Sequence, residues 1–200
     1  LDQSYEEAVV QRLIELSQDK QVIVFTHRLS LLGMIRHFAE KKAKLDVVSI
    51  RSAEWGSGEP AHIPISQSDI KTALNTLMNQ RYQDAKKASE NGDFEHAELV
   101  LKSICSDFRT LVERSIENDL LCGVVQRFQR PVHTSKLKDL AKLTDADCNF
   151  LDSLMTKYSR FEHSQPSESP VQLPTPDDLL TDMSLLKFWR EEYGKRSINA

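Results

Sequence analysis

Cysteine is scarce in this sequence, and its three cysteines lie far apart, at Cys105, Cys122 and Cys148. None of them belongs to a CxxC motif or to a Cys/His cluster. We therefore expect neither a disulfide framework nor a zinc site, because both need cysteines in pairs or at characteristic short spacings. Reduced thiols in a cytosolic protein fit best, since disulfides persist mainly in oxidising compartments.

Long apolar runs and a strong charge imbalance are also missing. No stretch approaches the roughly 18 apolar residues of a membrane span, and the first residues, LDQSYEEAVV, lack the basic and apolar regions of a signal peptide. We therefore expect no membrane partner. The 30 acidic and 26 basic residues give a net charge of −4, which provides no global attraction to nucleic acid. The sequence begins without methionine, so we expect it to be part of a longer protein.

Residues 1–64 have the pattern of an α/β fold. Apolar residues recur at helical spacing over 5–17, and Glu6, Glu7 and Glu15 are expected on the opposite, polar side. The run QVIVFT at 21–26 predicts a short strand buried on both faces of a parallel sheet. A helix over 30–42 and a strand over 45–51 should follow. Two glycines and two prolines then end the pattern near Pro64.

Residues 65–163 are predicted to be helical. A long helix should run from residue 66 to Asn91-Gly92, and a second, capped by Asp93, should return antiparallel to it as far as Leu121. Shorter helices are expected over 134–143 and 144–158. Residues 164–176 are rich in proline and serine and predict a tether, and 177–200 predict a docking helix anchored by Trp189. The expected fold class is α/β followed by all-α.

A histidine, His27, follows the predicted buried strand, at the edge where doubly wound α/β proteins place ligand-binding groups. Leu1-Asp2, the helix, the strand and Thr26-His27 resemble, in order and spacing, part of the nucleotide-binding lobe of ABC/SMC-like P-loop ATPases. In those proteins a D-loop ends in Leu-Asp and a later strand ends in the switch histidine. With YSRFEHSQP at 158–166, the sequence resembles the AAA-family, ABC-like ATPases of bacterial anti-phage and restriction-associated systems. The alternative is that His27 ends a strand in some other α/β protein.

The resemblance implies that His27 senses or polarises the γ-phosphate of ATP, and that Asp2 lies at the interface of a homodimer of ATPase lobes. ATP and Mg²⁺ would bind only to the full-length protein, because the sequence contains no GxxxxGK[ST] and no strand ending in paired acids precedes Leu1. The chain alone should therefore be inactive. Arg28 stands where such families often carry an acidic or polar residue, and we expect it to meet phosphate or to form a surface ion pair.

A second group of residues suggests a different activity. Arg109 and Glu113 are four residues apart, which places them on one helix face, and His163 could complete an acid/base set for cleaving RNA. These three are similar to the Arg, Glu and His of anticodon nucleases, whose ATPase domains belong to the same broad group. The alternative is a solvated ion pair. The spacing from Arg160 to His163 is too short for the Rx4–6H motif of HEPN ribonucleases.

The densest group of basic residues lies between the predicted helices of the second half. It could contact nucleic-acid phosphates, or it could be a solvated basic face; its members are Arg127, Arg130, His133, Lys136, Lys138 and Lys142. The primary functional prediction is a part of an ATPase that couples ATP hydrolysis to a nucleic-acid transaction or a defence effector. The alternatives are an ATP-regulated ribonuclease domain and a non-catalytic module that docks a nuclease partner.

Overall fold

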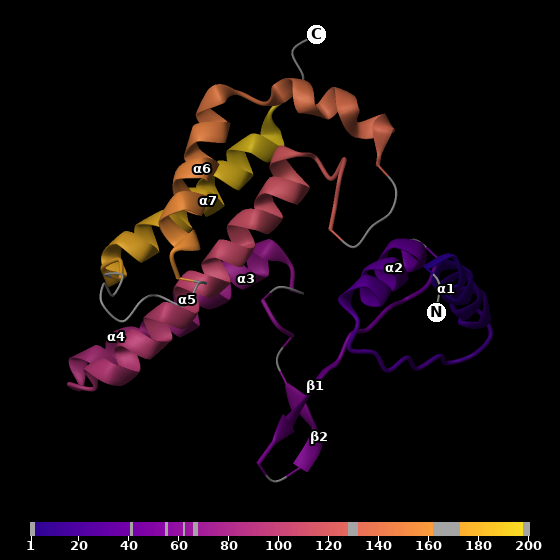
Figure 1. Ribbon diagram of the computed structural model, residues 1–200, viewed down its shortest axis with the longest axis horizontal. Helices are drawn as coiled ribbons and strands as arrows, with labels where there is room; N and C mark the ends of the chain where they lie inside the picture. Colours follow the sequence, from indigo (N-terminus) through magenta and orange to yellow (C-terminus); the bar gives the residue numbers. More distant parts are fainter. Residues whose placement is uncertain are drawn as a thin grey trace. The chain divides into compact units, whose positions relative to one another are not determined.

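The computed structural model describes residues 3–40, 42–54, 56–61, 63–65, 68–127, 132–161 and 173–197. The chain divides into two compact units (Figure 1). The first consists of Leu1–His62 and Val125–Val132, and the second of Ile63–Val124 and His133–Ala200. The second unit is mainly helical, whereas the first combines two helices with a two-stranded sheet and irregular segments. The one sheet among the described residues has two antiparallel strands. No helix in this part of the chain combines the length and apolarity needed to cross a bilayer.

Two short helices form the core of the first unit. Helix α1 covers Gln3–Leu16 and helix α2 covers Leu29–Ala39. Val10 and Ile14 of α1 are buried against Ala39, and apolar side chains of α2 complete this small cluster. Gln18, just after α1, donates a 2.9 Å hydrogen bond to the carbonyl oxygen of Lys42 beyond α2. The contact ties the end of one helix to the end of the other.

The segment between α1 and α2 contradicts the predicted buried strand. Residues 21–28 have no regular secondary structure, and no strand of the described chain pairs with them. Ile23 is 70% exposed, Val24 40% and Phe25 83%. The physical reason is that a central strand exists only between neighbours that accept and donate its backbone hydrogen bonds. The described residues contain neither such neighbours nor a parallel sheet.

The second predicted strand is displaced and joins an antiparallel hairpin. Strand β1 covers Ser49–Ala53 rather than 45–51, and β2 covers Gly56–Ala61. Arg51 lies opposite Glu59, and the register shifts between Arg51 and Ser52. Gly56, the first residue of β2, has φ 153° and Gly58 has φ 94°, so the glycines expected to end the α/β pattern instead belong to the returning strand.

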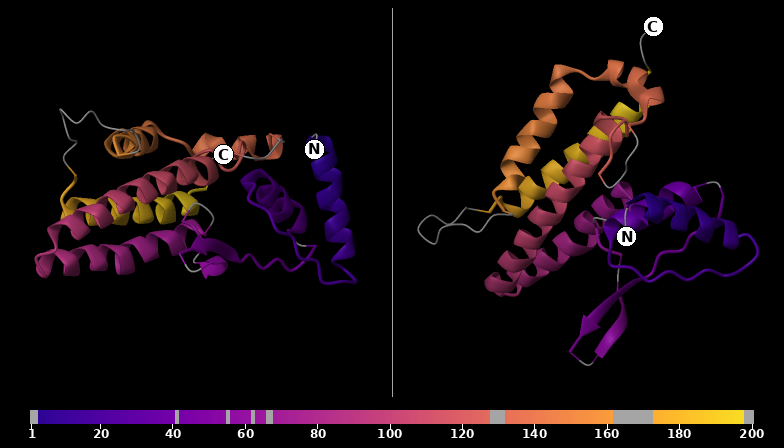
Figure 2. Two further views of the ribbon diagram at one scale, coloured as in Figure 1. Left: turned by 60° about the horizontal axis from the view of Figure 1, so that its bottom comes forward. Right: turned by 45° about the vertical axis from the view of Figure 1, so that its right-hand side comes forward.

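The second unit is built on a helical hairpin, as the sequence predicts. Helix α3 (Ile70–Thr76), a π-helical turn η1 (Leu77–Arg81) and helix α4 (Tyr82–Glu90) follow one another without a break. Gly92 has φ 80° and ends this helix, and Asp93 caps helix α5 (Phe94–Ser115) by accepting from the amide of His96. Helices α4 and α5 run side by side (Figure 2).

Three more helices complete the second unit. The π-helical turn η2 (Ile116–Leu120) extends α5, and a 3₁₀-helix η3 covers Thr134–Lys142. Helix α6 covers Asp145–Ser159, with a capping box between Thr144 and Asp147. Helix α7 covers Pro176–Lys195, with Pro176 in its first turn. The predicted tether, 164–176, lies mostly outside the described residues.

Helix α7 supplies one side of the core of the second unit. Its buried face packs against α3, α5 and α6 and consists of Leu179, Met183, Leu186, Trp189 and Tyr193. The core centres on α5, where Phe108 meets Tyr158 of α6 edge to face with 4.8 Å between ring centroids. Burial of so many large side chains is the main driving force for this unit.

Candidate functional site

The residues around His27 hold the backbone of this histidine in place. The amide of Arg28 donates a 3.0 Å hydrogen bond to Oγ1 of Thr26, which closes a tight turn around His27. The carbonyl oxygen of Arg28 accepts from the amide of Leu32 at 3.2 Å, so α2 starts directly after the turn. The ring of His27 is exposed and has no hydrogen-bond partner among the described residues. An anchored backbone therefore carries an available imidazole.

Arg28 forms an ion pair with Glu6 of α1. The side chain of Glu6 is only 5% exposed, whereas that of Arg28 is 49% exposed. The expectation that Glu6 lies on the polar side of α1 is therefore wrong. Its spacing of four residues from Val10, which is fully buried, places both on the inner face of the helix. A carboxylate buried in this way needs a cation, and Arg28 is that partner.

The structure places Arg109 and Glu113 in a shielded position on α5. Nη2 of Arg109 lies 2.8 Å from Oε1 of Glu113, and the two side chains are 17% and 14% exposed. Nε of Arg109 also donates a long, 3.4 Å hydrogen bond to Oγ of Ser159, at the end of α6. The pair is thus not the solvated ion pair that was the alternative. Sequence reasoning missed Ser159, because no local pattern signals a contact across 50 residues.

Asp2 and His163 lie outside the described residues, as does Arg130 of the basic group. Ser159, which contacts Arg109, is the last residue of α6. Neither predicted site can therefore be assembled completely from the described residues. What the structure does bring together is His27 with Thr26 and Arg28, and Arg109 with Glu113 and Ser159.

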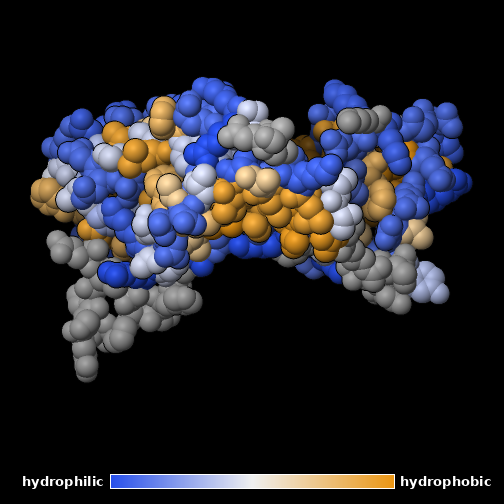
Figure 3. Space-filling view, turned by 90° about the horizontal axis from the view of Figure 1, so that it is seen from above, coloured by the Kyte–Doolittle hydropathy of each residue, from blue (hydrophilic) through white to orange (hydrophobic). Residues whose placement is uncertain are grey.

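The described members of the basic group are Arg127, which is exposed, His133, which precedes η3, and the three lysines of η3. Lys136 and Lys138 are exposed, and Nζ of Lys142 lies 4.6 Å from the centroid of the Tyr193 ring. Leu137, which lies between the first two lysines, is 49% exposed. Figure 3 shows apolar areas between hydrophilic ones on one face of the molecule. A mixed surface of this kind is weaker support for a phosphate-binding face than a purely basic one.

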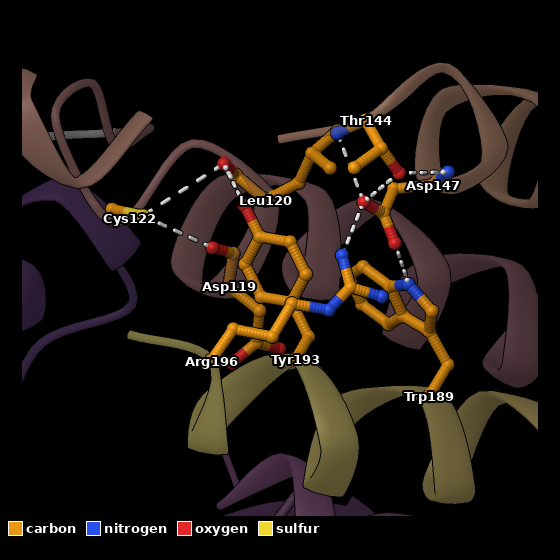
Figure 4. Close-up of polar contacts among 8 residues, drawn as sticks. All are labelled: Asp119, Leu120, Cys122, Thr144, Asp147, Trp189, Tyr193 and Arg196. Atoms are coloured by element: carbon orange, nitrogen blue, oxygen red, sulfur yellow. Dashed lines mark hydrogen bonds and ion pairs between the residues drawn. The ribbon is translucent and has the colours of Figure 1, made fainter. Parts of the chain in front are cut away.

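A polar network fixes α7 to the start of α6 (Figure 4). Asp147 accepts hydrogen bonds from Nε1 of Trp189 at 2.8 Å, from Nη1 of Arg196 at 2.6 Å and from the hydroxyl of Thr144 at 2.6 Å. Burial disfavours the charge of Asp147, but the hydrogen bonds from Arg196, Thr144 and Trp189 outweigh it and lower the pKa of this carboxyl to about 2. Because these hydrogen bonds all come from groups of the fold itself, we interpret Asp147 as a structural residue.

Metal-ligating side chains do not cluster among the described residues. No group of three His, Cys, Asp or Glu side chains in them is arranged to hold a metal ion. A shallow, open groove runs between α1 and α2, lined by Gln11, Ile14, Glu15, Gln18, Phe38 and Lys42. His27 is not among its lining residues. Burial raises the pKa of the Cys105 thiol to about 12, against a smaller opposing effect of Lys157, so this cysteine is not an activated nucleophile.

Comparison of the chain with protein-family models gives no match. Neither the curated proteins nor the solved structures contain a protein that matches it.

Proposed function

We propose that residues 1–64 are the C-terminal part of an ABC/SMC-like ATPase lobe and that His27 acts on the γ-phosphate of ATP bound by the full-length protein. The observation that carries the proposal is the arrangement around His27: an exposed apolar segment leads into an anchored turn whose imidazole is available. In a complete lobe, ATP hydrolysis would drive a nucleic-acid transaction or a defence effector.

The apolar segment 21–26 supports the proposal because it has the composition of a buried strand and yet is exposed among the described residues. Ile23, Val24 and Phe25 would each gain about 1.5–3 kcal/mol on full burial, and exposed runs of such side chains mark surfaces that bind another element. Neighbouring strands on both sides would bury these side chains and satisfy the backbone. His27 would then lie at the carboxyl edge of the sheet, where ligands bind in open α/β folds.

The role of His27 follows from its chemistry. An imidazole can donate a hydrogen bond from a ring nitrogen or carry a positive charge near neutral pH. Either form would stabilise the negative charge that develops on the phosphoryl oxygens in the transition state. A dimer of lobes would complete the site, with Asp2 at the interface. The phosphate-binding loop and the ligands of Mg²⁺ would come from residues outside this chain.

The test is ATP turnover by the full-length protein with His27→Ala. We expect kcat to fall on the order of 10²-fold while the affinity for ATP stays within about twofold, because the lost interaction forms mainly in the transition state. His37→Ala is the matched control, since His37 is a histidine of α2, beyond the turn that holds His27. Normal turnover by the His27 variant would reject the assignment of a switch histidine.

A second candidate function, cleavage of RNA, is favoured by the shielded Arg109–Glu113 pair beside Ser159. A partly buried guanidinium could stabilise a pentavalent phosphate, and a glutamate could serve as a base. On this hypothesis Arg109→Ala and Glu113→Ala abolish RNA cleavage but leave ATP turnover within about twofold. The exposed i,i+4 pair of Glu98 and Lys102 on the same helix provides the control. Loss of cleavage in Lys102→Ala as well would point to a general effect on α5.

A further inference from the structure

We infer that the ion pair between Glu6 and Arg28 positions His27, an inference that rests on the proposed role of this histidine. Arg28 follows His27 directly, and its guanidinium reaches back across 22 positions to the carboxylate of Glu6. Glu6 is buried in the first unit, on the face of α1 that also carries Val10. The pair therefore fixes the end of the apolar segment 21–26 to α1.

Three contacts converge on the turn, and none of them uses the ring of His27. Thr26 accepts from the amide of Arg28, the carbonyl oxygen of Arg28 accepts from the amide of Leu32, and the side chain of Arg28 binds Glu6. The first two contacts set the local backbone, and the packing of α2 against α1 holds the turn near the first helix only indirectly. Among the described residues, the ion pair is the contact that joins the turn itself directly to the first helix. Arg28 and Glu6 are thus positioning residues rather than catalytic ones.

The burial of Glu6 argues against a role of Arg28 as a direct phosphate ligand. A buried carboxylate whose cation moved to a phosphate would be left without a partner, which is strongly unfavourable. Replacing Arg28 alone would be uninformative, because Glu6 would then be buried without a cation and the folded state would be destabilised. The informative change removes both charges: the variant Glu6→Leu/Arg28→Met replaces the pair by apolar groups of similar size, which usually preserves stability.

The experiment measures kcat and KM for ATP in the full-length protein. We expect Glu6→Leu/Arg28→Met to melt within a few degrees of the parent yet to lose about tenfold in kcat with little change in KM, because misplacing a catalytic group acts on the transition state. Arg28→Lys should keep most of the activity, since an ammonium can still pair with Glu6. The exposed pair of Arg12 and Glu15 on the same helix, 68% and 65% exposed, supplies the control Arg12→Met, which should turn over normally.

Combining these changes with His27→Ala separates positioning from direct action. If the pair acts through His27, adding Glu6→Leu/Arg28→Met to His27→Ala lowers kcat no further. A further tenfold loss would overturn the inference and assign Arg28 to the phosphate. Wild-type kcat in Glu6→Leu/Arg28→Met would also overturn it.

A second measurement keeps the inference testable if His27 proves dispensable for ATP turnover. Within the stretch from Thr26 to Leu32, hydrogen exchange of the Arg28 and Leu32 amides, which donate the hydrogen bonds of the turn, reports its mobility directly. We expect exchange in this stretch to be at least tenfold faster in Glu6→Leu/Arg28→Met than in the parent and unchanged in Arg12→Met. Unchanged exchange would show that the pair does not hold the turn, whatever the role of His27.

Discussion

Asp147 joins α6, α7 and the residue after α7 through one buried carboxylate. Its pKa of about 2 lies below the ordinary value of 3.8 for an aspartate, so the folded state favours the ionised form. The resulting stabilisation, about 2 kcal/mol, is fully present above pH 4 and is lost as the pH falls from about 4 towards 2. We expect urea denaturation to show a smaller loss of stability between pH 7 and pH 2.5 in Asp147→Asn than in the parent.

The control for this prediction is Asp145→Asn, because Asp145 is exposed and lies in the first turn of the same helix. This variant should keep the acid sensitivity of the parent, since its charge interacts mainly with solvent. Parallel pH dependence in the Asp147 variant and the parent would show that the network of Figure 4 does not stabilise the charged carboxylate.

Single residues show where sequence reasoning reaches its limit. The capping role of Asp147 follows from its position three residues after Thr144, which is local information. Its bond to Trp189 spans 42 positions and has no local signature. Glu6 was assigned to the polar side of α1 by residue type, whereas its spacing from Val10 places it inside. The residue type of Glu6 favours the exposed side of α1, and its spacing from Val10 favours the buried side. The distant cation of Arg28 allows the carboxylate to be buried.

At the scale of elements, helix α7 packs one face into the core, so that consecutive residues on it differ in burial. Trp189 is 8% exposed and donates to Asp147, whereas Phe188 is 62% exposed. We expect Trp189→Ala to lower the free energy of unfolding by about 3–5 kcal/mol, through a cavity and an unpaired acceptor. Phe188→Ala should lower it by less than about 1 kcal/mol. Thermal and urea denaturation measure both, and equal losses would contradict the docking arrangement of α7.

Helices were predicted better than strands in this chain for a physical reason. Helical hydrogen bonds and caps are local, so Asp93, Thr144 and Pro176 mark helix starts that the structure contains. A strand depends on partners elsewhere. The run 21–26 has the composition of a central strand but no neighbour among the described residues, and Gly56 and Gly58 belong to a strand that sequence reasoning treated as a loop.

At the scale of the whole molecule, the two units differ in the size of their hydrophobic cores. In the described residues, the buried side chains of the first unit's hydrophobic cluster are only three, Val10, Ile14 and Ala39. The second buries a large cluster drawn from α3, α5, α6 and α7. A unit with so small a core gains little from burial, and its exposed apolar segment 21–26 offers the surface that further strands would cover. This contrast supports the proposal that the first unit is part of a larger lobe.

The proposal makes a prediction for the 200-residue chain by itself. We expect it to bind ATP with no measurable affinity in the micromolar range, with or without Mg²⁺, because nucleotide binding by P-loop ATPases relies on backbone amides and a lysine of a motif that this sequence lacks. Isothermal titration calorimetry of the chain is the measurement. The full-length protein is the positive control, and its His27→Ala variant should still bind ATP. Micromolar binding by the chain alone would show that it contains a nucleotide site of its own, and the assignment of His27 to a shared site would then be wrong.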